Sequence, residues 1–226
     1  MNKIYILFLL FFAVQFTFGQ NGCNGSTPEW GERLGEVSFK TNRTWIVGNQ
    51  EWSDVVMATA CQKESFDGGY GSPTPSIPAN FNADCCSNSD YGDLFSWCAV
   101  VRFQNQLCPN DWRVPTWEDF QKLDIALGGT GYETLSDTSF INNKYLNDSI
   151  WGGTLGGYRS NFIGSAVENL QYQGIRAFYW SQSDFLDNGF GLRFYSDDGS
   201  ISPQGSTWKD NGRLLRCVRC KSNQNK

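Results

Sequence analysis

Residues 108–123 read CPNDWRVPTWEDFQKL and give the clearest structural signal in the chain. Pro115 keeps Val114 extended, because a proline disfavours the helical conformation for the residue before it. Thr116 then offers a hydroxyl as a helix N-cap, and Asp119 stands at the third helical position, which resembles a capping box with Asp in place of Glu. The stretch therefore predicts a short extended segment that leads directly into a helix.

The side chains after Thr116 have helical spacing. The apolar ones fall on one face and are Trp117, Phe120, Leu123 and Leu127. Glu118 and Lys122 form an i,i+4 pair on the outside, and the glycines at 128–129 supply a stop. We expect a helix that begins after Thr116 and ends before these glycines.

The first residues have the features of a secretory signal. Lys3 precedes an apolar run from Ile4 to Phe18, and Gly19 offers a small residue for cleavage. The run is shorter than the roughly 20 apolar residues that a spanning helix needs, and no second such run follows. We expect residues 1–19 to be a signal peptide and residues 20–226 to form a single domain. The protein is then exported to the periplasm, the outer-membrane surface or the medium.

Charge and composition exclude several functions. The formal net charge is −5 and no basic stretch occurs, so neither nucleic acid nor an anionic membrane is an expected partner. The chain contains no histidine, which removes the commonest general base and the Ser-His and Cys-His nucleophile pairs. We therefore do not expect an enzyme.

Eight cysteines in an exported chain predict disulfides. They are Cys23, Cys61, Cys85, Cys86, Cys98, Cys108, Cys217 and Cys220. The alternative is a zinc site at the Cys-x-x-Cys of residues 217–220. Zinc would need scattered ligands, because there is no second such pair and no histidine.

The rest of the chain predicts an α+β fold with about two helices. We expect a hairpin or two short strands within 36–52 and a long, cysteine-tied loop over 65–89. A stripe at Leu94, Trp97, Cys98 and Val101 indicates a helix within 91–104, with a buried strand as the alternative. Residues 130–173 have the composition of irregular, partly buried loops.

The C-terminal part has strand-length runs separated by turn residues. The runs are 177–183, 190–199, 201–208 and 212–219, and Asp198-Gly199 is a typical hairpin turn. We expect them to form an antiparallel sheet that closes the domain.

Six blocks, in this order and spacing, resemble the Fibrobacter succinogenes major paralogous domain, a family common in exported proteins of Bacteroidetes-like bacteria. They are Gly48–Trp52, Tyr91–Trp97, Cys108–Thr116, Gly156–Arg159, Tyr179–Ser181 and Leu215–Arg219. That family is similar to the C-type-lectin-like and formylglycine-generating-enzyme group. The resemblance implies a lectin-like domain whose two termini lie together on one sheet and whose long loops carry the ligand surface.

The resemblance also implies a disulfide framework. Cys108 would pair with Cys217, and Cys23 with Cys220. Cys61 and Cys98 would share Cys85 and Cys86 in either order, since adjacent cysteines seldom bond each other without strain.

Aromatic and arginine side chains in the loops are the candidate ligand-binding groups. The aromatic candidates are Trp151, Tyr158, Tyr172 and Trp208, and each of them has the alternative of packing in the core. Arg159 is a candidate to orient a carboxylate, as is Arg216, with an internal ion pair as the alternative for both. Acidic groups at the strand ends are weak candidates for calcium, with solvated hairpin tips as the alternative; they are Asp184, Asp187, Asn188, Asp197 and Asp198.

These observations favour an exported, non-catalytic binding module that recognises a glycan or a protein at the bacterial cell surface. The alternative is a structural or accessory subunit of an outer-membrane or surface assembly. A third function, implied by the resemblance alone, is a formylglycine-type oxidase working through copper-binding cysteines, for which Cys217 and Cys220 are the candidate thiols. No cofactor other than calcium is expected.

Overall fold

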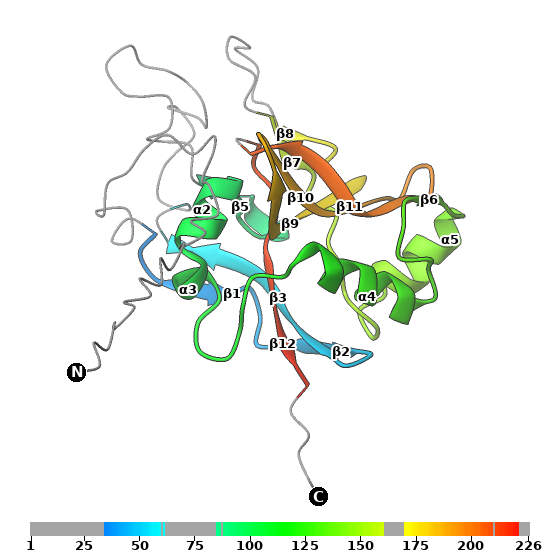
Figure 1. Cartoon of the computed structure of the whole chain (residues 1–226), viewed down its shortest axis with the longest axis horizontal. Coiled ribbons are helices and arrows are strands. Elements are labelled where there is room, and N and C mark those ends of the chain that lie inside the picture. The colour runs from blue at the N-terminus through cyan, green and yellow to red at the C-terminus, as the bar shows by residue number, and fades with distance from the viewer. Residues whose placement is uncertain are drawn as a thin grey trace, which may run out of the picture.

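The computed structural model describes residues 34–59, 61, 85–86, 88–160, 170–209 and 211–221. The expected signal peptide lies outside them. The described residues form helices and antiparallel sheets, so the α+β class is confirmed (Figure 1). They contain four α-helices where about two were expected, and two of the four are only three and four residues long. No helix in this part of the chain is long and apolar enough to cross a bilayer.

The first sheet is built on β3 (Gln50–Ala58). β1 (Val37–Phe39) and β2 (Thr44–Val47) pair one after the other with the same edge of β3, and β12 (Arg216–Cys220) pairs with the opposite edge. β2 and β3 form the hairpin expected near the start of the domain. The first and last described strands therefore lie in one sheet.

The second sheet has the order β6-β11-β10-β9. Its strands are β6 (Thr134–Leu135), β9 (Arg176–Phe185), β10 (Asn188–Tyr195) and β11 (Ser200–Trp208). Three of the four expected C-terminal strands are confirmed here, and the expected turn at Asp198-Gly199 joins β10 to β11.

The structure does not show the expected sheet of all four C-terminal runs, because the last strand pairs with β3 and not with β9–β11. The chain leaves that sheet after Trp208 and runs between the two sheets instead. Leu214 bonds to the backbone of β9 at Phe178 and Trp180, and the N–H of Val56 in β3 bonds to Leu215. The strand then continues as β12 beside β3, as Figure 1 shows at its centre.

This course is explained by burial on both faces of the central strands. Successive residues of an extended chain point to opposite faces, and here the two faces meet two different hydrophobic clusters. The consecutive pairs that divide between the clusters in this way are Val55 and Val56, Leu94 and Phe95, Tyr179 and Trp180, Leu214 and Leu215, and Val218 and Cys217. The C-terminal segment thus contributes side chains to both cores at once.

The helix expected from the opening stretch is confirmed as α4 (Trp117–Leu127). The N–H of Thr116 donates to Asp119 Oδ2 at 2.7 Å, the N–H of Asp119 donates to Thr116 Oγ1 at 3.4 Å, and together they form the capping box. Gly128 ends the helix in the left-handed conformation, with φ +102°. Arg113 adds a pair of bonds to the Asp119 carboxylate, so the extended segment before the helix is fixed to its first turn.

The earlier helix begins later than expected. Ser96 caps α2 (Trp97–Arg102) by accepting a bond from the Ala99 N–H, and α3 (Gln104–Leu107) follows. Gly92 interrupts the expected helix, because its φ of +96° lies outside the helical region and a Cβ at this position would lie 2.5 Å from Val55 Cγ2. The preceding residues form a 3-10 turn (Ser89–Tyr91) and the short pair β4 (Cys85–Cys86) and β5 (Leu94–Phe95).

Residues 130–160 and 170–173 are mostly irregular, as expected, and pack closely. They include α5 (Thr138–Phe140), which continues into a π-helical turn (Ile141–Tyr145), and the paired strands β7 (Tyr158–Arg159) and β8 (Leu170–Gln171). Asp137 caps α5 by accepting the N–H of Phe140, a start signal that composition alone obscured.

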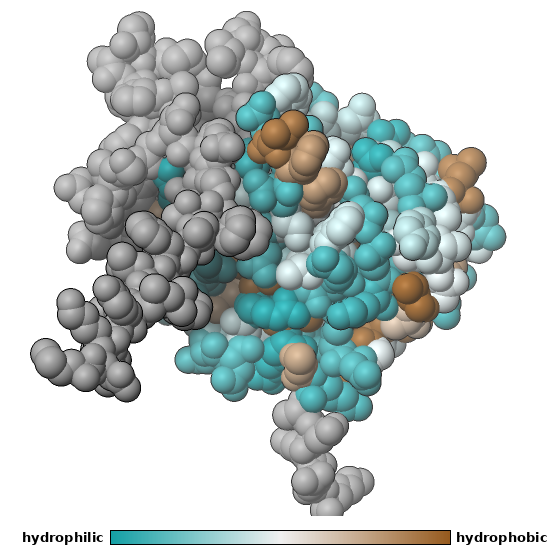
Figure 2. All heavy atoms as spheres, viewed as in Figure 1, coloured by the Kyte–Doolittle hydropathy of each residue, from teal (hydrophilic) through white to brown (hydrophobic). Residues whose placement is uncertain are grey.

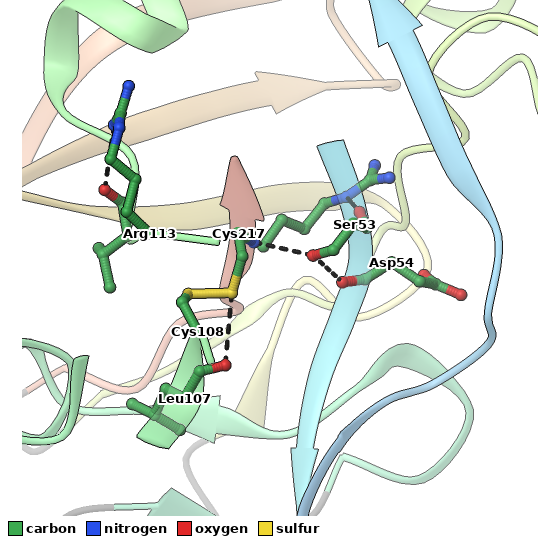
Figure 3. The surroundings of a disulfide bond; sticks show 8 residues. Ser53, Asp54, Leu107, Cys108, Arg113 and Cys217 are labelled. Atoms are coloured by element: carbon green, nitrogen blue, oxygen red, sulfur yellow. Dashed lines mark hydrogen bonds between the residues drawn. A yellow bond between two sulfur atoms is a disulfide. The ribbon is translucent and has the colours of Figure 1, made fainter. Parts of the chain in front are cut away.

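The structure joins Cys108 to Cys217, the bridge implied by the resemblance. It ties the end of α3 to β12, and the Cys217 N–H also donates to Ser53 Oγ at 2.9 Å (Figure 3). Cys61 and Cys98 are disulfide-bonded as well. Their implied pairing with Cys85 and Cys86 stays a prediction, because it lies outside the described side chains.

Cys220 departs from the implied framework. It carries an exposed free thiol, so the bridge to Cys23 is not formed in the structure. Cys23 itself lies outside the described residues.

Replacing both Cys108 and Cys217 by serine should lower the free energy of unfolding by about 2–5 kcal/mol, because the bridge closes a loop with a sequence separation of 109. Denaturant unfolding followed by tryptophan fluorescence measures the change. Cys220→Ser is the matched control and should leave the unfolding midpoint unchanged. Equal midpoints for all three proteins would show that the bridge contributes nothing.

Asp119→Asn should destabilise the fold by about 1–3 kcal/mol at neutral pH. Burial alone would raise the pKa of Asp119, but the hydrogen bonds from Arg113 and Thr116 outweigh it and hold the pKa below its ordinary value. The carboxylate therefore stabilises the fold above its unfolded pKa of about 4, and this contribution is lost as the pH falls further. As the pH falls, the free energy of unfolding should decrease less in Asp119→Asn than in the control Asp111→Asn, which changes an exposed residue. Equal decreases in the two variants would contradict this.

Candidate binding surface

Four side chains from separate segments meet at one end of the second sheet. They are Tyr158, Tyr172, Arg176 and Tyr195, and we call them the tyrosine–arginine surface. β7 pairs with β8 and so places Tyr158 near the residue that follows β8, while the β9–β10 register sets Arg176 opposite Tyr195. Two of the four, Tyr158 and Tyr172, are candidates from the sequence.

The side chains of this surface are stacked. The Arg176 guanidinium lies 4.3 Å from the ring centroid of Tyr172 and 4.2 Å from that of Tyr195. The rings of Tyr158 and Tyr172 follow with centroids 6.1 Å apart and planes 23° apart. Asp197 accepts bonds from Arg176 Nε and Nη2, and these bonds raise the pKa of Arg176 and lower the pKa of Asp197. The arginine is thus held charged and in place between two rings.

Tyr172 is the most exposed ring of the surface, and its backbone is strained. It has φ +59°, a left-handed conformation that is a genuine outlier for a bulky residue, and it remains 42% exposed. The turn is held by the N–H groups of Ile175 and Arg176, which both donate to the Tyr172 carbonyl. Strain of this kind persists only where the surrounding structure enforces it, and it concentrates at functional sites.

Apolar side chains flank the same end of the sheet. Leu170 is 38% exposed and Ile175 is 42% exposed, and Figure 2 shows an apolar patch over β7 and β8 in an otherwise mostly hydrophilic region. Tyr158 is half-buried, and burial is the main cause that raises its pKa. Its hydroxyl donates to Gln171 at 2.8 Å, which fixes the ring. The surface therefore offers rigid aromatic groups beside exposed aliphatic ones.

The two tryptophan candidates are not part of this surface. Trp151 is wholly buried against Trp52 and Tyr179, so its assignment to ligand binding is wrong and the core alternative holds. Trp208 is exposed but pairs with Asn188 at the start of β10, whereas Tyr195 ends that strand. The two ends are separated by seven residues of extended chain, roughly 23 Å.

The arginine candidates are internal. Arg159 is buried, and its N–H donates to the Gly212 carbonyl. Arg216 is fully buried between the rings of Trp45 and Trp151, where burial lowers its pKa to about 10. It donates to backbone carbonyls instead of an acid, so neither the carboxylate role nor the ion-pair alternative describes it.

The calcium candidates do not converge on one point. Asp184, Asp187 and Asn188 lie at the β9–β10 hairpin, while Asp197 and Asp198 lie at the opposite end of β10. Asp184 pairs with Lys209 at 2.7 Å, and Asp197 pairs with Arg176. Calcium needs six to eight oxygens around one centre, and in the described part of the chain no three acidic or cysteine side chains form such a group.

The thiols suggested for oxidase chemistry are not a free pair. Cys217 is joined to Cys108, and Cys220 alone carries a free thiol among the described cysteines. Their Cys-x-x-Cys spacing therefore does not form a dithiol or a zinc-binding pair in this structure.

Arg176 and Tyr195 were missed by sequence reasoning. Tyr195 lies inside the predicted run 190–199, whereas Arg176 lies one residue before the predicted run 177–183 and begins β9 in the structure. The information that joins them is the strand register, which pairs residue 176 with residue 195. The tyrosines at positions 172, 179 and 195 point to this part of the chain, but they do not show that Arg176 lies opposite Tyr195.

These features define a class: an α+β domain built on two four-stranded antiparallel sheets, with a disulfide to its last strand and with aromatic side chains displayed on short strands and turns. Residues 42–219 match the Fibrobacter succinogenes major domain, and the chain belongs to that family. No curated protein and no solved structure matches the chain significantly.

Proposed function

We propose that this protein is an exported, non-catalytic binding module that recognises a glycan or a protein at the bacterial cell surface. The tyrosine–arginine surface is the binding site, and the cell envelope or its exterior is the location. Neither catalysis nor a bound metal is part of this function.

The observation that carries the proposal is the strained, exposed Tyr172. Aromatic faces bind sugars and partner side chains well because they are large and lose little entropy when they are fixed. Here Tyr158 and Arg176 fix the ring of Tyr172 before any ligand binds. The Tyr172 backbone adopts a strained left-handed conformation at this position. A purely structural turn at this position would be better served by glycine.

The same reasoning gives a sharp test through Tyr172→Gly. The change removes the ring and also relieves the strain, which is worth about 1–2 kcal/mol and offsets the lost cation–π contact of about 0.5–1 kcal/mol. Thermal stability should therefore be unchanged or slightly higher, while binding to the glycans or surface proteins selected on an array should fall at least about tenfold.

Tyr132→Gly is the control, because Tyr132 is exposed but lies in the turn after α4, outside the tyrosine–arginine surface. It should leave binding unchanged. Tyr172→Gly with a large loss of stability and unaltered binding would make Tyr172 a structural residue and remove the proposal.

We extend the proposal to the fold: a C-type-lectin-like arrangement in which residues 20–226 form one domain behind a cleaved signal peptide. It is supported by β1 and β12 lying on opposite edges of β3 and by the helix α4 that follows the Arg-Val-Pro-Thr segment. It is also supported by the two cores sharing the same central strands, which leaves no boundary at which to divide the described residues.

A second function, as an accessory subunit of a surface assembly, is favoured by a separate feature. The β9–β10 hairpin end exposes Phe185 (65%), Leu186 (65%) and, on the neighbouring strand, Trp208 (57%). Asn188 of β10 lies directly opposite Phe185 of β9 on one side and Trp208 of β11 on the other. The side chains of Phe185 and Trp208 therefore project from the same face of the sheet. Exposed apolar groups of this kind are typical of protein contacts.

For this second function, Phe185→Ser with Trp208→Ser should abolish co-purification of a stoichiometric partner from native cells, because the variant lacks the shared apolar face. Ile46→Ser, an exposed apolar position in β2, is the control and should retain the partner. Failure of the unaltered protein to retain any partner would dismiss the accessory role.

A further inference from the structure

The ring of Phe178 lies beneath the tyrosine–arginine surface and has tyrosine and arginine side chains near it. Its centroid lies 4.9 Å from that of Tyr158 and 5.7 Å from that of Tyr195. The Arg213 guanidinium lies 5.2 Å from the same ring, and Arg193 is the cross-strand neighbour of Phe178 in β10. One guanidinium group and two phenol rings thus lie around one buried ring, and a second arginine stands on the neighbouring strand.

Arg213 is held there by its backbone. It exchanges two hydrogen bonds with Phe95 of β5, and the next residue bonds to β9. Its guanidinium lies over Phe178 and, at 4.6 Å, over the ring of Trp180. The position of the side chain on the inner face of β9 is therefore fixed from both sides.

The guanidinium of Arg213 has no polar partner within the described part of the chain. The residue is only 3% exposed, and its Nε and Nη1 are closed to solvent without a hydrogen bond. None of the ion pairs formed by the described residues includes it. Burial, with a smaller contribution from the charge of Arg193, lowers the pKa of Arg213 to about 9.

Arg216, three residues later, is a buried arginine that does have acceptors for two of its nitrogens, although its Nη2 lacks one. Its Nε donates to the Ser53 carbonyl at 2.5 Å, and its Nη1 donates to the Trp151 carbonyl at 2.8 Å. It too is stacked between rings, so stacking alone does not explain why Arg213 lacks such bonds. A buried cation without an acceptor is costly, and a bound acceptor relieves that cost.

Only one nitrogen of the Arg213 guanidinium is open to a bound acceptor. Nη2 is the guanidinium nitrogen of Arg213 that is not closed off, and it shares one edge of the guanidinium with Nη1 and the other with Nε. A carboxylate or sulfate oxygen that arrives at Nη2 would accept a charge-assisted hydrogen bond from it. Arg193 is already paired, because its Nη2 donates to both carboxylate oxygens of Glu133.

We propose that the ligand of the tyrosine–arginine surface is an acidic saccharide, whose carboxylate or sulfate binds Arg213 while its ring stacks on the adjoining tyrosines. This inference rests on the proposed binding function and names the chemistry of its ligand. The saccharide is favoured over an acidic peptide because Tyr158 connects the two parts of the site. Its ring contacts Phe178, over which Arg213 lies, and also Tyr172, a ring that is 42% exposed and suited to packing against a sugar.

The test is calorimetric titration of the full mature chain with four probes: trigalacturonic acid, its carboxyl-reduced neutral trimer, a sulfated trisaccharide and hexaglutamate. At least one acidic saccharide should bind about tenfold or more tightly than the neutral trimer. The first and third probes separate carboxylate from sulfate recognition.

Arg213→Met is the matched variant. Replacing an unpaired buried cation by an apolar side chain should keep or raise the unfolding temperature, so loss of binding is not confused with misfolding. The variant should bind acidic and neutral trimers with affinities within about threefold of each other. Arg213→Lys, which keeps the charge without the fork, should recover only part of the preference, and Arg43→Gln, at an exposed ion pair, should keep all of it.

The outcomes separate this inference from the binding function itself. Equal affinity of the unaltered protein for acidic and neutral trimers, or an acidic preference that survives Arg213→Met, overturns the acidic saccharide and leaves the module standing. Preference for hexaglutamate overturns it in favour of an acidic peptide. Absence of binding to any of the four probes, together with a blank glycan and protein array, overturns both.

Discussion

The structure depends on a single extended segment, residues 213–220, that must satisfy two hydrophobic cores at the same time. Its alternating side chains enter opposite clusters, and its backbone is bonded in turn to β5, β9 and β3. This requirement explains why the segment leaves the sheet of β9–β11 and why its cysteine is fixed to the end of α3. Each hydrophobic cluster contains side chains from both sheets and from this segment, so removing the segment would open both clusters.

The candidate binding surface follows from the same arrangement. β9 is held on its inner face by the segment that carries Arg213, and the rings of Phe178 and Trp180 lie between them. Because the sheet register is set by the core, Arg176 and Tyr195 are brought opposite each other at a sheet end where nothing else demands aromatic residues. Rigidity at the surface is therefore inherited from packing below it.

Sequence patterns predicted the parts of the fold that local chemistry controls. The helix α4 was predictable because Pro115, Thr116, Asp119 and the glycines after Leu127 all act within a few residues of one another. The strands around Asp198-Gly199 were predictable for the same reason. The position of β12 was not, since strand alternation identifies a strand without naming its neighbour.

The site was less predictable than the fold. Tyr158 and Tyr172 were singled out by composition, yet Trp151 has the same local composition and is a core residue. Burial depends on contacts such as those of Trp151 with Trp52 and Tyr179, which are distant in sequence. The resemblance to a family supplied the Cys108–Cys217 pairing, which spacing alone leaves among many alternatives.

The central position of the final strand also governs when this protein can fold. A nascent chain that has emerged only as far as Trp208 contains most of both sheets but lacks the residues that fill the space between them, so each open core remains exposed to water. Long-range closure of this kind is slow, and the exposed cores leave the unfinished chain prone to aggregation. The complete fold can therefore form only after residue 220 has been synthesised.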